Sequence, residues 1–142
     1  MTPSPLKYVD DNIFNLLSDE RVIGFYLYDN LNQEVERIKG LLVDPDTYKP
    51  RYLVIKIGGL MFTEGKLVLV PRAMYEPDGL GRARVDWSRE SLQQGPYIQN
   101  IQHLTREEEQ VILSYFDLEP YWDVEQEAAD SEKQQRTVKI EE

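Results

Sequence analysis

The chain has 142 residues, a length that fits one domain with short extensions. It contains no cysteine, which excludes disulfides, thiolate metal sites and cysteine nucleophiles. Its formal net charge is −10, which disfavours direct contact with nucleic acid or with an anionic membrane surface. The sequence has no run of about 18 apolar residues that could span a membrane. It also does not open with a basic stretch followed by an apolar one, so we expect a cytoplasmic protein without a membrane span.

The first twenty residues are predicted to form an N-terminal segment outside the main fold. Residues 1–8 show no core pattern and are expected to be mobile. Four apolar residues cluster between positions 13 and 17, after two aspartates that can cap a helix. This pattern predicts a short helix or turn over residues 10–17 that closes one end of the domain.

Five short segments rich in β-branched and aromatic residues follow at regular spacing. They are residues 21–28, 34–43, 52–57, 66–70 and 82–87. The stretches between them contain turn-forming residues, including 44–50 and the glycines and polar residues of 58–65. Gly40 lies inside the second segment and predicts a bend or bulge there. Short, regularly spaced strands predict a small barrel or sandwich over residues 21–87.

Residues 88–122 are predicted to be a C-terminal extension that packs on the barrel. Thr105 and Glu108 have the spacing of a capping box, which predicts a helix over residues 105–118. The apolar stripe predicted for this helix consists of Val111, Ile112, Tyr115, Phe116 and Leu118. Residues 123–142 are acidic and poor in apolar side chains, so we predict a disordered tail.

Few side chains have a pattern typical of catalysis or metal binding. His103 is the only histidine, and because no other ligands are spaced around it we predict a structural or surface role. Asp44 and Asp46 lack the spacing of a calcium loop, and helix capping explains the acidic run 107–109. The chain has neither a glycine-rich phosphate loop nor a nucleophile elbow. We therefore expect no catalytic residue, cofactor or metal, and no enzyme.

Aromatic residues beside prolines are the candidates for partner contact. Tyr97, Tyr121 and Trp122 lie at the ends of predicted elements, close to Pro96 or Pro120. They could be wedges that hold the extension on the barrel, or exposed anchors for a partner, since aromatic residues dominate many interfaces. Both interpretations stay open on sequence grounds. The aromatic residues predicted to be core are Trp87, Tyr115 and Phe116.

With the strands placed, residues 22–75 resemble the PRC-barrel domain. That family includes the cytoplasmic part of the photosynthetic reaction-centre H subunit and the C-terminal domain of the ribosome-maturation factor. The stretches that carry the resemblance are residues 22–29, 41–47, 51–55 and 65–71. Three positions at which the family often has glycine hold Asn32, Glu36 and Tyr48 here, so the turn geometry could differ at these places.

The resemblance implies a mainly β fold: a small PRC-type β-barrel with a short N-terminal helix or turn and a C-terminal α-helix. The family shares no catalytic residues, so the resemblance implies an adaptor or assembly module that acts through protein contact. Such a module could dock on a photosynthetic or other membrane complex from the cytoplasmic side. The alternatives are a ribosome-assembly factor that binds a basic ribosomal protein, and a small-ligand-binding barrel or enzyme. A homodimer is also open, because a short barrel leaves sheet edges that can pair.

Overall fold

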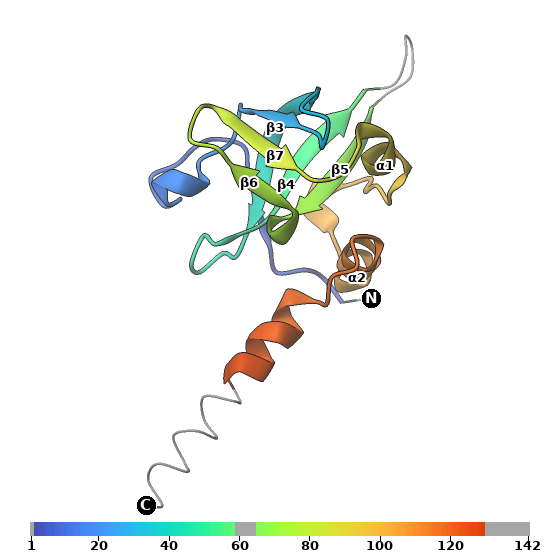
Figure 1. The fold of residues 1–142 in the computed structure, drawn as a ribbon. Coiled ribbons are helices and arrows are strands. Elements are labelled where there is room, and N and C mark those ends of the chain that lie inside the picture. The colour runs from blue at the N-terminus through green and yellow to red at the C-terminus, as the bar shows by residue number, and fades with distance from the viewer. Residues whose placement is uncertain (1, 59–64, 130–142) are drawn as a thin grey trace, which may run out of the picture.

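The computed structural model describes residues 2–58 and 65–129, and its centre is a curved sheet (Figure 1). Neighbouring strands follow the order β5-β4-β3-β2-β7-β6, and β1 also pairs with β3. The pairs are antiparallel except for β2 with β7. The strands are β1 (Lys7–Val9), β2 (Tyr26–Tyr28), β3 (Glu34–Val43), β4 (Pro50–Ile57), β5 (Lys66–Pro71), β6 (Tyr75–Pro77) and β7 (Arg82–Val85). The predicted mainly β, PRC-barrel-like fold is confirmed in the form of a half-barrel.

Helices occupy the connections and the C-terminal part. The 3-10 helices are η1 (Ser18–Glu20), η2 (Arg72–Met74) and η3 (Ile101–His103), and the α-helices are α1 (Arg89–Gln94) and α2 (Arg106–Tyr115). Residues 121–129 are also helical and extend away from the barrel (Figure 1). The predicted reversal at residues 59–64 and the predicted disorder of 130–142 lie outside the described residues.

Strand β3 joins the two halves of the sheet. Its first part pairs with β2, and its second part pairs with β4 and β1. The register shifts between Ile38 and Gly40, which is the bulge that the glycine predicts. Leucine, isoleucine and valine side chains from both halves form the core, and Leu27, Ile38 and Leu53 are almost completely buried.

The N-terminal segment differs from its prediction. Residues 7–9 form β1, which pairs with residues 41–43 of β3, so the expected mobility of residues 1–8 is wrong there. The Ser4 amide also donates to the Leu104 carbonyl at 2.9 Å. The predicted first strand is shorter than expected, because residues 22–25 form a turn around Gly24, which has a φ of 88°. Only residues 26–28 join the sheet as β2.

Two of the three non-glycine turn positions keep a geometry that favours glycine. Asn32 has a φ of 60° and Tyr48 a φ of 58°, both in the left-handed region. Asparagine tolerates this region, whereas tyrosine does so at a cost. Contacts compensate for that cost, because the Tyr48 amide donates to Asp44 and its hydroxyl accepts from Lys7 at 2.9 Å.

Helix α2 begins as predicted and ends earlier. Thr105 and Glu108 form the complete capping box. At the other end Asp117 has a φ of 57°, and the Leu118 amide donates to the Leu113 carbonyl at 2.9 Å. This Schellman motif, with aspartate at the usual glycine position, stops the helix at Tyr115 rather than at 118. Val111 was predicted to lie on the apolar stripe of this helix, but it is 59% exposed, so the prediction is wrong at this position.

Candidate interaction surfaces

A buried carboxylate connects the barrel to the C-terminal extension. Glu109 of α2 is 0% exposed, and its Oε1 accepts hydrogen bonds from the hydroxyls of Tyr52 in β4 at 2.9 Å and of Tyr121 at 2.7 Å. Its Oε2 pairs with Nη1 of Arg106 at 3.2 Å. The same Arg106 nitrogen donates to the Tyr121 hydroxyl at 2.9 Å. The carboxylate therefore holds β4, α2 and the start of the 121–129 helix together.

Cationic side chains stack on the aromatic residues at this junction. The guanidinium of Arg51 lies 4.2 Å from the Tyr121 ring centroid, and that of Arg106 lies 4.0 Å from the Trp122 ring centroid. Arg51 also pairs with Glu125 at 2.7 Å. These contacts order residues 121–129. The predicted disorder is therefore wrong for residues 123–129. Two of the three aromatic candidates for partner contact, Tyr121 and Trp122, are thus half-buried against the protein itself.

Burial changes the acid–base behaviour of three tyrosines. It raises the pKa values of Tyr52, Tyr75 and Tyr121 well above the usual tyrosine value, and Glu109 adds to the effect on Tyr52 and Tyr121. These phenols hold their protons more tightly in the folded state than in the unfolded chain. Their stabilising contribution is therefore complete below about pH 10, the unfolded pKa, and is lost as the pH rises above it.

We therefore expect the protein to unfold in alkali as these tyrosines ionise. Part of the tyrosinate absorbance should appear only together with the loss of circular dichroism, because the three buried rings ionise on unfolding. Smooth titration of all nine tyrosines with the circular dichroism spectrum retained would contradict this expectation. A spectrum of the chain in denaturant supplies the unfolded reference.

Large apolar side chains project from the loop of residues 10–20. Phe14 is 92% exposed and Leu17 is 76% exposed, whereas Leu16 between them is buried in the core. The side-chain amide of Asn12 exchanges two hydrogen bonds with the main chain of Ile23, at 2.9 and 3.1 Å. The loop is therefore fixed to the barrel while two of its apolar residues face outward.

Arg21 also fixes the loop of residues 10–20 through hydrogen bonds to its main chain. Its Nε donates to the Leu16 carbonyl at 3.0 Å and its Nη2 to the Phe14 carbonyl at 3.3 Å. Its guanidinium also lies 5.7 Å from the Phe14 ring centroid. The predicted helix or turn over residues 10–17, which was expected to close one end of the domain, did not indicate this exposure. Residues 13, 14, 16 and 17 cannot all face one core from a short turn, and that crowding was the available signal.

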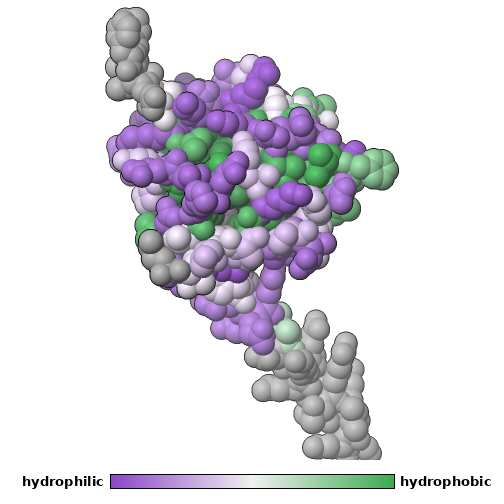
Figure 2. Space-filling model, turned by 180° about the vertical axis from the view of Figure 1, so that it is seen from behind, coloured by the Kyte–Doolittle hydropathy of each residue, from purple (hydrophilic) through white to green (hydrophobic). Residues whose placement is uncertain are grey.

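A cleft of about 550 Å³ lies beside this loop, between η1 and the turn that joins β6 to β7. Phe25 lines it, and the ion pair of Glu20 with Arg72, at 2.8 Å, lies in its wall. Leu80 follows the lining residue Gly79 and is 76% exposed. Hydrophobic surface reaches the right-hand edge of the space-filling view, the side on which this loop lies (Figure 2). We call Phe14, Leu17 and Leu80 the apolar end.

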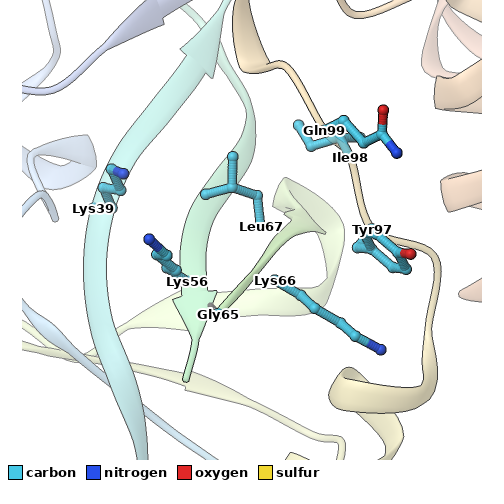
Figure 3. Close-up of a pocket in the computed structure, with 8 residues that line it drawn as sticks. All are labelled: Lys39, Lys56, Gly65, Lys66, Leu67, Tyr97, Ile98 and Gln99. Atoms are coloured by element: carbon cyan, nitrogen blue, oxygen red, sulfur yellow. The ribbon is translucent and has the colours of Figure 1, made fainter. Parts of the chain in front are cut away.

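A second cleft of about 510 Å³ lies where β3, β4 and β5 meet residues 97–99 (Figure 3). The Ile98 amide donates to the Leu67 carbonyl at 3.1 Å, which fixes this segment against β5. The basic residues that line the cleft are Lys39, Lys56 and Lys66. The ammonium of Lys66 lies 4.9 Å from the ring centroid of Tyr97, the most exposed of the three aromatic candidates at 51%. We call this cleft the lysine trough.

The remaining candidates from the sequence have local structural roles. His103 ends η3 on the surface, and Asp44 pairs with Arg51 at 2.6 Å. Within residues 2–58 and 65–129, no group of three or more histidine and acidic side chains is placed to hold a metal ion. In the same part of the chain, no helix has the length and apolar character needed to cross a bilayer.

Comparison with known proteins agrees with the architecture. Residues 14–89 match the PRC-barrel domain. The matched stretch contains β2 to β7, begins at Phe14 of the apolar end and ends at the first residue of α1, whereas β1 and α2 lie outside it. A comparison with curated proteins gives no match. Because the matched residues form more than half of the chain, the protein belongs to the PRC-barrel domain family.

Proposed function

We propose that the protein is a non-enzymatic interaction module whose protein partner docks on the apolar end. The carrying observation is the exposure of Phe14 and Leu17 on a loop that is held rigidly by Asn12 and Arg21. Large apolar groups on an ordered surface lose contact with water when a partner covers them, without an ordering cost for the loop. The adjacent cleft, lined by Phe25 and by charged residues such as Glu20 and Arg72, can accept a side chain from the partner.

The charges around the apolar end indicate the chemistry of the partner. Asp10, Asp11 and Asp19 are exposed on the same loop, and the whole chain carries a net charge of −10. Such a surface favours a protein that presents an apolar socket with a basic rim, and it is repelled by anionic lipid. The favoured reading is thus docking on a protein subunit, including one of a photosynthetic or other membrane complex reached from the cytoplasmic side.

The second candidate is an assembly role on a basic ribosomal protein. The observation that favours it is the same acidic surface, because ribosomal proteins are strongly basic while direct RNA contact is disfavoured by the charge of this chain. Affinity capture from separate soluble and membrane fractions of a native extract, followed by identification of the bound proteins, distinguishes the two candidates. A chain with residues 123–142 deleted reports whether the tail takes part.

Phe14→Ser with Leu17→Ser is expected to weaken the captured complex at least 30-fold, because a single hot-spot side chain contributes about 2 kcal/mol or more. Binding of the identified partner is measured by titration calorimetry with purified proteins. Leu31→Ser is the matched control: Leu31 is also highly exposed, but it lies in the β2–β3 turn. Strands β2 and β7 are parallel; Leu31 follows β2, whereas Leu80 precedes β7. The two leucines therefore lie at opposite ends of this strand pair.

Equal binding by the double variant and the control would overturn the proposal. Sedimentation of both variants tests the homodimer alternative, in which the apolar ends of two copies would meet. The wild-type protein could be a dimer that the double variant Phe14→Ser with Leu17→Ser dissociates. In that case a second copy of the chain covers the apolar end, and the proposal of a different protein partner fails. A ligand-binding or catalytic barrel would instead be revealed by a small molecule that co-purifies and binds equally to all variants.

A further inference from the structure

The lysine trough holds a local excess of positive charge on an acidic protein. The structure describes five lysines, and two of them are engaged elsewhere: Lys7 donates to the Tyr48 hydroxyl, and Lys49 pairs with Glu125. The other three line the trough. In the described part of the chain none of these three forms an ion pair with a carboxylate. Unneutralised ammonium groups gathered in one cleft attract an anionic ligand.

The arrangement of the lysines fits an extended ligand better than a compact one. Lys39 and Lys56 lie on one side of Leu67, whereas Lys66 reaches out on the other side toward Tyr97 (Figure 3). The three ammonium groups therefore do not converge on one point, as they would around a phosphate. Between them, Leu67 and Ile98 supply an apolar floor that a small inorganic anion does not need. Charges spaced along an apolar strip match carboxylates spaced along a peptide.

We propose that the lysine trough binds an acidic peptide segment that carries an aliphatic side chain. Carboxylates of the segment pair with Lys39, Lys56 and Lys66, and its aliphatic group covers Leu67. The start of β5 lies at the far side of the barrel from the loop of residues 10–20 (Figure 1). The protein thus presents two chemically different contact surfaces, and the trough can be occupied while the apolar end is also bound. This inference is independent of the partner proposed for the apolar end.

The test uses the full chain and a fluorescent peptide, Glu-Glu-Leu-Glu-Glu, followed by anisotropy. Lys39→Glu with Lys56→Glu is expected to weaken binding about tenfold or more, since each substitution removes an attractive charge and adds a repulsive one beside the peptide carboxylates. The matched control is Lys7→Glu with Arg84→Glu, which changes the net charge equally outside the trough. Wild-type affinity should fall with added salt, and the Lys39/Lys56 variant should have a shallower salt dependence.

Three results would overturn the inference. They are equal weakening by the control pair, equal binding of the uncharged peptide Gln-Gln-Leu-Gln-Gln, and inorganic phosphate binding as tightly as the glutamate peptide. The last result would identify the trough as a simple anion site. Circular dichroism melts of each variant verify that the fold is intact, and exposed lysines on strands permit this exchange without loss of core packing.

Discussion

Replacing Glu109 by alanine is expected to lower the free energy of unfolding by about 3 kcal/mol. The substitution leaves the buried hydroxyl of Tyr52 without its acceptor and removes the carboxylate that pairs with Arg106. It also opens space beneath Tyr121, whose hydroxyl loses its 2.7 Å hydrogen bond to the carboxylate. The Tyr52 side chain is fully buried, so water cannot replace the missing acceptor there.

Urea unfolding followed by tryptophan fluorescence measures this loss. Glu107→Ala is the control on the same helix: Glu107 is solvent-exposed, and its carboxylate accepts from the Thr2 amide at 3.0 and 3.2 Å. We expect a far smaller effect from it. Tyr52→Phe removes one donor but no charge, so its expected cost is about 1 kcal/mol. If Glu109→Ala is no worse than Glu107→Ala, the carboxylate does not hold the extension on the barrel.

The contrast between Glu109 and its neighbours shows where sequence reasoning stops. Acidic residues in the first turn of a helix suit its dipole, so the run 107–109 has a complete local explanation. Glu108 indeed caps the helix. Glu109, however, points at Tyr52, which is 57 residues away in the chain. The capping-box spacing identifies Glu108, but nothing local separates the buried Glu109 from the exposed Glu107, because that difference is made by strand β4.

The strands, by contrast, could be predicted because the patterns that form them are local. Residues 34–43, 52–57 and 66–70 alternate or run continuously apolar between turn residues, and the structure places strands there with boundaries shifted by at most two residues. The short strand β1 has only three residues, too few for any pattern, and it exists because β3 offers it an edge.

The lysine trough and the apolar end also could not be predicted from the local sequence. The lysine trough takes one basic residue from each of three strands, and each alone looks like an ordinary solvent-facing strand residue. Apolar crowding at residues 13–17 indicated that some side chains must face outward, but the choice of Phe14 and Leu17 depends on how Arg21 and Asn12 fix the loop. Local pattern therefore predicts elements well, whereas surfaces assembled from several elements require the fold.

Gly40→Ala is expected to cost about 2–3 kcal/mol, the upper range for overpacking in a closed site. A β-carbon at this position would lie 2.5 Å from Cε1 of Tyr8 and 2.6 Å from the carbonyl oxygen of Val9. Real contacts of this kind do not occur, so β1 or the tyrosine ring must move. The expected result is weakened pairing of β1 with β3, seen as faster amide hydrogen exchange at residues 7–9 in addition to a lower unfolding free energy.

Gly58→Ala is the matched control, since among the described residues its β-carbon would have only the Glu36 carboxylate nearby, at 3.9 Å. A second variant separates the two obstacles at Gly40. Tyr8→Ala removes the ring but leaves the Val9 carbonyl in place, so adding it to Gly40→Ala should recover only part of the loss. Full recovery would mean that the ring alone opposes the methyl group. If Gly40→Ala behaves like Gly58→Ala, β1 does not depend on a glycine at the bulge, and the close approach of the two strands does not limit stability.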